Sequence, residues 1–177
     1  NTYLTTGPWV AEFERKAREF CGSTYALAVN SGTAALHCAM FSLDLQPTDE
    51  VIVTGLSFVA SANCIVYCGA TPIFCDIEED TMNIDPTKIE TLITERTKAI
   101  IAVDFAGQLC NYTELHKLAQ KYSLTIIADA AHSFGISHDN KYVGTFADIT
   151  TTSFHPVKNM TTCEGGMGRS RCFSTTS

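Results

Sequence analysis

Lys158 stands out because it lies in the stretch TTSFHPVKNMTTCEGGM, between a run of hydroxyl residues and a Glu-Gly-Gly sequence. A lysine on the protein surface is the ordinary interpretation. A lysine held in a polar pocket can instead use its free amine to attack a carbonyl carbon. The second interpretation requires further groups at the same place in the fold.

Asp129 is the first candidate partner, because it follows the very apolar segment TIIA. A carboxylate so close to a core needs a partner, since an unpaired buried charge costs several kcal/mol. It could cap a helix or bind a metal ion, or it could keep a heteroaromatic nitrogen protonated. Lys158 follows 29 residues later, after another predicted strand, so both side chains can reach one edge of a sheet.

The segment VNSGTAAL, residues 29–36, predicts a strand, a turn of small residues and the start of a helix. Free backbone N–H groups, the Thr33 hydroxyl and the positive end of the helix dipole suit a phosphate. Ser31 as a plain N-cap is the simpler alternative for this stretch alone. A lysine, a carboxylate and a phosphate-binding turn together form the set that pyridoxal phosphate (PLP) requires. Phe58 could stack on its ring, although a phenylalanine in such a segment is more often a core residue.

The surrounding pattern alternates between apolar strands and amphipathic or apolar helices, which is typical of an α/β protein with a mostly parallel sheet flanked by helices. In such sheets ligands bind outside the carboxyl ends of the strands. The polar residues that end strands are therefore the informative ones: Asn30, Ser31, Gly32, Thr33, Asp104, Asp129 and Ser153. We expect helices over residues 9–21, 31–45, 61–67, 85–94 and 111–123, and strands over 25–30, 50–55, 71–77, 98–105, 124–130 and 148–154, the last being the final full strand.

Composition limits the functional class. The 177 residues are 45% hydrophobic and 18% charged, with a formal charge of −7 and no dense basic patch, which argues against nucleic acid as a ligand. No stretch approaches a membrane span, and no signal peptide is visible. The eight cysteines are scattered without zinc spacing, so we expect reduced thiols, no metal site and a cytoplasmic protein.

From about Tyr3 to Met167 the sequence resembles the sugar aminotransferases of the DegT/DnrJ/EryC1/StrS family, a branch of the fold-type I PLP enzymes. The resemblance rests on the order and spacing of six segments: YLTTGPWVAEFE, VNSGTAAL, SFVASANCIVYCGATPIFCDI, NIDPTKIETLITERTKAIIAVDFAGQ, ADAAHSFG and SFHPVKNMTTCEGGM.

The resemblance implies a role for each matching residue. Lys158 would be the lysine that bonds to the cofactor aldehyde, Asp129 would pair with the pyridine nitrogen, and His132 would lie near the ring hydroxyl. The expected phosphate and ring contacts are Gly32, Thr33, Ala34, Ser153 and Phe58, and Tyr3, Leu4, Thr5, Gly32 and Ser153 would approach a sugar nucleotide. For His155 the sequence leaves two alternatives open: local packing and an active-site role.

The implied reaction is transfer of an amino group, from glutamate, to the 4-keto carbon of a UDP-linked sugar by a homodimer. A PLP-dependent sugar dehydratase is a rival, but such enzymes carry histidine where this chain has Lys158. The other rival interpretation is a non-catalytic module with the fold of a PLP enzyme. After residue 167 the sequence GRSRCFSTTS departs from the family pattern. We therefore expect a partial large domain over residues 1–167, an aberrant or truncated tail over 168–177, and no C-terminal small domain.

Overall fold

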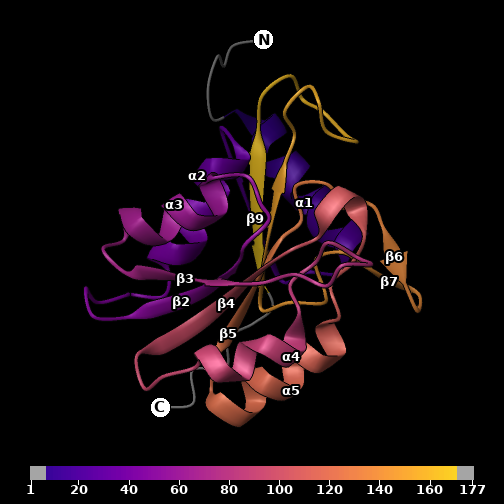
Figure 1. Cartoon of the computed structure of the whole chain (residues 1–177). Helices are drawn as coiled ribbons and strands as arrows, with labels where there is room; N and C mark the ends of the chain where they lie inside the picture. Colours follow the sequence, from indigo (N-terminus) through magenta and orange to yellow (C-terminus); the bar gives the residue numbers. More distant parts are fainter. Residues whose placement is uncertain (1–6, 171–177) are drawn as a thin grey trace.

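The computed structural model describes residues 7–170 and is built around one seven-stranded sheet of order β1-β9-β8-β5-β4-β2-β3 (Figure 1). Four neighbouring pairs, β2 with β3, β2 with β4, β4 with β5 and β5 with β8, are parallel. Only β9 runs antiparallel to its two neighbours, β1 and β8. The predicted mostly parallel α/β sheet is therefore confirmed.

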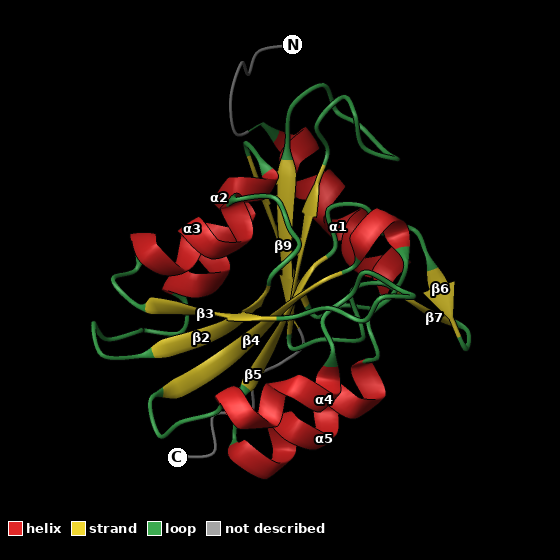
Figure 2. Cartoon of the chain, in the orientation of Figure 1, coloured by secondary structure: helices red, strands yellow, loops and turns green. Residues whose placement is uncertain are grey.

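Helices and strands alternate along the chain (Figure 2). The helices are α1 Pro8–Cys21, α2 Gly32–Phe41, α3 Ala60–Tyr67, α4 Pro86–Ile89 and α5 Tyr112–Tyr122, with 3-10 turns at Glu90–Leu92 and Phe105–Gly107. The strands are β1 Tyr25–Val29, β2 Glu50–Thr54, β3 Thr71–Cys75, β4 Thr97–Val103, β5 Thr125–Asp129, β8 Ile149–Ser153 and β9 Gly166–Ser170. A small hairpin pairs β6 Ser137–His138 with β7 Lys141–Tyr142.

The helix ends follow local sequence signals. Ser31 caps α2 by accepting a hydrogen bond from the backbone N–H of Ala34, and Asn111 caps α5 in the same way through Glu114. Pro8 lies at the first position of α1, and Gly22 ends that helix in the left-handed conformation, which glycine adopts at little cost.

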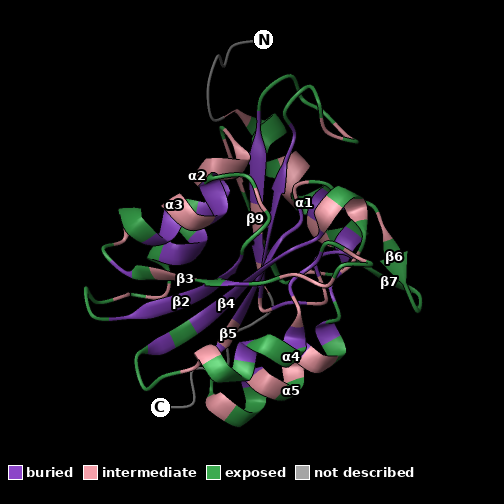
Figure 3. Cartoon of the chain, in the orientation of Figure 1, coloured by how far each residue is buried: buried purple, intermediate pink, exposed green. Residues whose placement is uncertain are grey.

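Two apolar layers cover the sheet. Val51, Val53 and Ile101 pack against α2 and α3 on one face, whereas Ile52, Ile100 and Ile126 pack against α5 on the other. Helix α1 covers the end of this second face, where Ala17 packs near Ala26 and Ala28 of β1. Figure 3 shows the central strands mostly buried between these helices. Burial on both faces explains why β2 and β4 read as unbroken apolar runs.

Three details differ from the sequence prediction. Residues 148–154 were expected to hold the last full strand, but β9 follows and lies between β1 and β8; it includes residues 168–170, which were assigned to the tail. Strand β1 is an apolar run in the sequence, yet it lies at the edge of the sheet and its Tyr25 and Leu27 are exposed. The helix expected over residues 85–94 is only the short α4 followed by a 3-10 turn.

The cysteines of the described part are free thiols, as the sequence predicted, and Cys172 lies outside it. Burial raises the pKa of Cys64 to about 12 and that of Cys75 to about 11, so these thiols stay protonated in the core. Within residues 7–170, none of the helices has the length and apolarity needed to cross a bilayer.

Candidate active site

The carboxyl ends of the parallel strands surround a cavity of about 490 Å³. Segments that follow β1, β2, β4, β5 and β8 all contribute to its wall, which is the arrangement expected for this type of sheet. Of the residues predicted from the sequence, the cavity is lined by Ser31, Gly32, Thr33, Phe58, Asp129, His132, Ser153, His155 and Lys158, whereas Ala34 does not line it.

The start of α2 forms one wall. The hydroxyl oxygen of Ser31 accepts a hydrogen bond from the N–H of Ala34 at 3.1 Å, so Ser31 is the N-cap that the simpler interpretation predicted. The backbone N–H groups of Gly32 and Thr33 have no acceptor within residues 7–170, and both residues line the cavity. Two free donors at the positive end of a helix suit an anionic group.

Close backbone contacts hold this wall in place. A Cβ atom on Gly32 would lie 2.8 Å from the Cβ of Ser153, and one on Gly166 would lie 2.2 Å from the carbonyl oxygen of Ser31. Both distances are far shorter than any real contact, so only glycine lets β8, β9 and the start of α2 meet here. The Gly-Gly sequence after Glu164 therefore permits a close backbone approach between β9 and the start of α2.

Asp129 ends β5 and lies at the bottom of the cavity with 5% of its surface exposed. Its Oδ2 accepts a hydrogen bond from Ser61 Oγ at 2.6 Å, and its Oδ1 accepts one from the N–H of Ala131 at 3.2 Å. Burial raises the pKa of this carboxyl, while the hydrogen bonds and the nearby His132 and Lys158 oppose that rise. A buried carboxylate facing a cavity is suited to hold a cationic ring N–H.

Lys158 lies opposite, in the loop after β8, and is only partly buried. Its Nζ is 2.9 Å from Nε2 of His132, the residue that follows β5 by three positions. Burial and the neighbouring Lys158 lower the pKa of His132, which favours the neutral imidazole and leaves Nε2 free to accept from the ammonium group. The structure thus brings a lysine, a neutral histidine and a buried carboxylate to one cavity.

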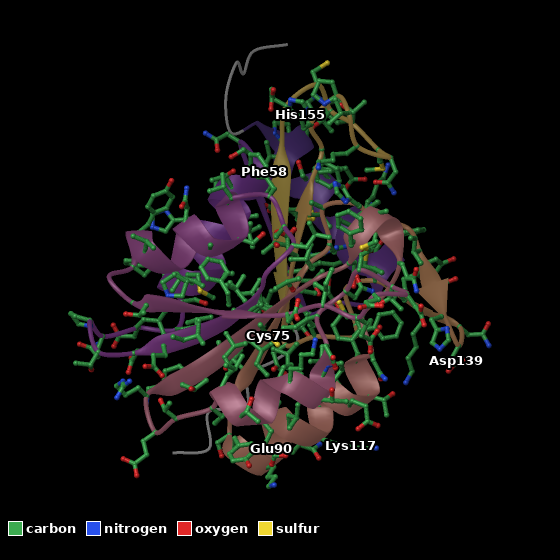
Figure 4. All side chains as sticks on the ribbon, in the orientation of Figure 1. Phe58, Cys75, Glu90, Lys117, Asp139 and His155 are labelled. Carbon is green, nitrogen blue, oxygen red and sulfur yellow. The ribbon has the colours of Figure 1, made fainter. Side chains whose placement is uncertain are left out.

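Phe58 and His155 lie on the rim. Phe58 is 73% exposed, so the more common expectation that it would be a core residue is wrong. His155 is also exposed and lies 3.7 Å from the carboxylate of Glu164, which lines the same cavity. Figure 4 shows Phe58 and His155 at one end of the molecule, far from Asp139 at the turn of the β6–β7 hairpin.

Some predicted positions fall elsewhere. Thr161 and Thr162, the hydroxyl residues that follow Lys158 in the sequence, do not line the cavity; each hydroxyl donates to a backbone carbonyl of the loop. Asp104 also ends a strand but lies outside the cavity wall. Tyr3, Leu4 and Thr5 lie outside the described residues.

Other cavity residues were not predicted from the sequence, among them Ser57, Phe105, Thr151, Thr152 and Glu164. Nor was Ser61, which donates a hydrogen bond to Asp129 from the first turn of α3. The spacing of Ser57 and Ser61 by four residues, in a segment otherwise apolar, was an available signal. Among the described residues there is no group of three or more His, Cys, Asp or Glu side chains that could hold a metal ion.

Comparison with known proteins places these features in context. GDP-perosamine synthase from Caulobacter vibrioides is 43% identical over 163 residues, which are 92% of this chain and 44% of that protein. The PLP form of the sugar aminotransferase Spr1654 from Streptococcus pneumoniae superimposes with a TM-score of 0.94 at 36% identity, over 97% of this chain and 48% of that one.

A second solved structure is PseC from Helicobacter pylori, an aminotransferase of pseudaminic acid biosynthesis, with a TM-score of 0.90 and 38% identity over 98% of this chain and 47% of that one. This chain therefore spans less than half the length of each of these relatives. Structures of Spr1654 have been solved with PLP and with PMP, the amino form of the same cofactor. PLP is the cofactor predicted from the sequence. Because the model of the DegT/DnrJ/EryC1/StrS aminotransferase family matches residues 1–170, the chain belongs to that family.

Proposed function

We propose that this chain is the cofactor-binding part of a PLP-dependent aminotransferase that moves an amino group from glutamate to the 4-keto carbon of a UDP-linked keto-deoxy sugar. The observation that carries the proposal is the single cavity into which Lys158, Asp129 and the start of α2 all face. These are the three groups needed for an aldehyde, a pyridine nitrogen and a phosphate on one small molecule.

The residues present fit PLP. The N–H groups of Gly32 and Thr33 and the Ser153 hydroxyl would hold the phosphate, with Ala34 contributing through the helix dipole, since its own N–H is occupied. The absence of a Cβ at Gly32 keeps this cradle open. Phe58 on the rim would cover the ring, and His132 beside Lys158 would lie near the ring hydroxyl.

When bound, PLP supplies an aldehyde that bonds to amines and a protonated ring that withdraws electrons. Asp129 would keep the ring nitrogen protonated, because a buried carboxylate stabilises a cationic N–H in contact with it. The Nζ of Lys158 would carry the proton between the substrate carbon and the cofactor, acting as general base and then as general acid. Neutral His132 orients Nζ through its 2.9 Å contact.

The proposed substrate class rests on the resemblance of the active-site segments to the transaminase that makes UDP-4-amino-4,6-dideoxy-N-acetyl-L-altrosamine. The similarity to PseC supports a pseudaminic acid or related surface-sugar pathway. Gly32 and Ser153 line the cavity, and we propose that they approach the sugar nucleotide together with Tyr3, Leu4 and Thr5. His155 and Glu164 also line it and are proposed to meet sugar hydroxyls.

A homodimer of the complete protein in the cytoplasm is part of the proposal. Exposed large apolar side chains support an interface, for example Trp9 at 70%, Phe41 at 76% and Val66 at 55% exposure. A PLP-dependent sugar dehydratase is disfavoured because residue 158 is lysine rather than histidine. A non-catalytic PLP-binding module remains the alternative to be separated by experiment.

The test uses purified protein mixed with PLP. A yellow absorption band should appear, and Lys158→Ala should abolish it. Borohydride reduction followed by peptide mapping should label Lys158; a label on another lysine would overturn the assignment. Lys121, which is exposed and paired with Glu90, offers the control variant Lys121→Ala, which should keep the band.

Turnover is tested separately with glutamate and a UDP-linked 4-keto sugar. Appearance of the amino sugar supports the proposed reaction, and release of a deoxygenated product without an amino group would favour the dehydratase. PLP binding through Lys158 without any product over many hours would favour the non-catalytic module.

A further inference from the structure

A row of two hydroxyl groups ends on the carboxylate of Asp129. Ser57 Oγ is 2.6 Å from Ser61 Oγ, and Ser61 Oγ is 2.6 Å from Asp129 Oδ2. Ser61 is completely buried at the first turn of α3, and Ser57 lines the cavity. The row therefore runs from the cavity wall, through the core, to the back of the carboxylate.

The direction of the hydrogen bonds follows from counting protons. An ionised carboxylate can only accept, so Ser61 must donate its single hydroxyl proton to Asp129. The oxygen of Ser61 is then left to accept, and Ser57 must be the donor of the other bond. Both dipoles point toward the charge, and each bond strengthens the other in a buried environment.

We propose that Ser61, supported by Ser57, is a positioning residue that fixes the orientation of Asp129 and keeps it ionised at the bottom of the cavity. The inference rests on the proposed function, because it assigns Ser61 a role toward the ring-binding carboxylate. Each carboxylate oxygen has two lone pairs, so the bonds from Ser61 and Ala131 leave acceptor sites directed at the cavity.

A purely structural role for Ser61 would be to satisfy its own hydroxyl in the core. That role does not require a partner in the cavity wall, nor a charged acceptor. Burial works against the ionised form of Asp129, and the pKa of the carboxyl is raised for that reason. Hydrogen bonds to the charged form oppose this rise, and that from Ser61 is the largest such contribution.

Other titratable groups interact electrostatically with Asp129 and must be held constant in any test. They are His132 after β5, Lys158 after β8, Cys64 on α3 and Tyr112 on α5. None of them is changed by a substitution at Ser61. The chain also offers a matched control: Ser133 is completely buried, and its hydroxyl donates to Asp104 Oδ2 at 2.7 Å.

The deciding measurement is the titration of the Asp129 carboxyl carbon by ¹³C NMR in the protein without cofactor. Ser61→Ala should raise the apparent pKa of Asp129 by about one unit, because a bond to the charged form is lost. Ser133→Ala should leave the Asp129 titration within about 0.2 units, and Ser61→Thr, which keeps the hydroxyl, should remain near the original value. An unchanged Asp129 titration in Ser61→Ala, or an equal shift in Ser133→Ala, would overturn the proposal.

Backbone amide spectra establish that each variant is folded. If Ser61→Ala does not fold, Ser57→Ala decides, because it weakens the same row from the cavity side: a rise of about half a unit supports the proposal and no rise overturns it.

A second readout uses added PLP. In Ser61→Ala, the pH range over which the absorption of the bound cofactor changes should move upward, as the titration of the carboxyl does. In Ser61→Thr, the absorption should change over the same pH range as in the original protein. If PLP does not bind the original protein, the proposed function fails, whereas the titration of the cofactor-free protein still decides the role of Ser61.

Discussion

Asp104 and Asp129 form a natural comparison, because both are buried carboxylates at the carboxyl ends of adjacent parallel strands, β4 and β5. Asp104 accepts hydrogen bonds from the N–H of Cys110, the hydroxyl of Tyr112 and the hydroxyl of Ser133. Asp129 accepts from Ser61 and Ala131 and faces the cavity. One carboxylate is enclosed by its own protein, and the other keeps acceptor capacity for a ligand.

This difference shows why a polar residue at a strand end is not by itself evidence of an active site. Burial raises the pKa of both carboxyls, so their electrostatic environments alone do not separate them. What separates them is which groups surround their oxygen atoms: protein donors alone for Asp104, and protein donors together with the cavity for Asp129. Asp104 ties the loop after β4 to α5 and to the loop after β5, whereas Asp129 bonds to Ser61 and Ala131 and also lines the cavity.

The largest expected effect is that of Asp129→Asn on chemistry. The rate at which glutamate bleaches the absorption of bound PLP should fall at least about a hundredfold, because an amide does not keep the ring nitrogen protonated. The melting temperature should change little. Stopped-flow absorbance and thermal melting measure the two quantities, and an equal loss of folding and reaction would assign Asp129 a structural role.

Asp104→Asn should have the opposite profile. Its amide NH₂ would be turned toward at least one of the three donors, leaving a buried donor unsatisfied at a cost of about 2–4 kcal/mol in the free energy of unfolding. The affinity of the folded fraction for PLP should stay within about threefold. Urea denaturation and PLP titration test this; a stable variant that no longer binds PLP would reverse the comparison.

Arg169 on β9 extends the comparison to a buried charge: its guanidinium lies 5.1 Å from the centre of the Phe134 ring, but its hydrogen-bonding capacity is mostly unused among residues 7–170. Its side chain is 1% exposed, its only hydrogen-bond partner among the described residues is the thiol of Cys21, and its Nε and Nη2 have no acceptor there. Arg169→Met should therefore raise the free energy of unfolding by about 1–3 kcal/mol, because a poorly satisfied buried guanidinium is replaced by an apolar side chain.

The matched control is Arg96→Met, which removes a more exposed arginine paired with Glu50. That variant should lose stability by up to about 1 kcal/mol. Urea denaturation of both variants checks the pair, and a destabilised Arg169→Met would show that this guanidinium has favourable partners in solution.

The smallest effect concerns pH. Because the folded-state pKa of Asp129 is raised, the folded protein holds a proton that the unfolded chain has already released, so this group makes stability fall as pH rises above about 4, the ordinary pKa of an aspartate. Asp129→Asn should reduce that fall, and Asp104 contributes to it with the same sign.

Asp76 provides a control of opposite sign. The neighbouring Lys88 lowers the pKa of Asp76, so its contribution is present above about pH 4 and is lost as pH falls through the lowered value. Asp76→Asn should therefore remove stability at neutral pH but not in strong acid. Urea denaturation between pH 3 and 7 measures how the free energy of unfolding depends on pH in Asp129→Asn and Asp76→Asn. If both variants changed that dependence in the same direction, the opposite signs assigned to the two carboxyls would be wrong.

The sequence alone determined the elements whose signals are local. The alternation of apolar strands and helices predicted the parallel sheet, because strands buried on both faces must be apolar throughout. Asp129 was found because a carboxylate follows an apolar strand, where parallel sheets bind ligands, and Lys158 because it lies between a run of hydroxyl residues and a Glu-Gly-Gly sequence. Ser31 was recognised because capping depends only on the next three residues.

Tertiary structure decided the features that depend on distant neighbours. The segment GMGRS of β9 contains two glycines and no β-branched residue, and it is a strand because β1 and β8 supply hydrogen-bond partners on both sides. Ser61 bonds to a residue 68 positions away, and the enclosure of Asp104 depends on a loop 29 positions away. Hydrogen bonds between segments so far apart depend on how the chain packs, and no short sequence pattern carries that information.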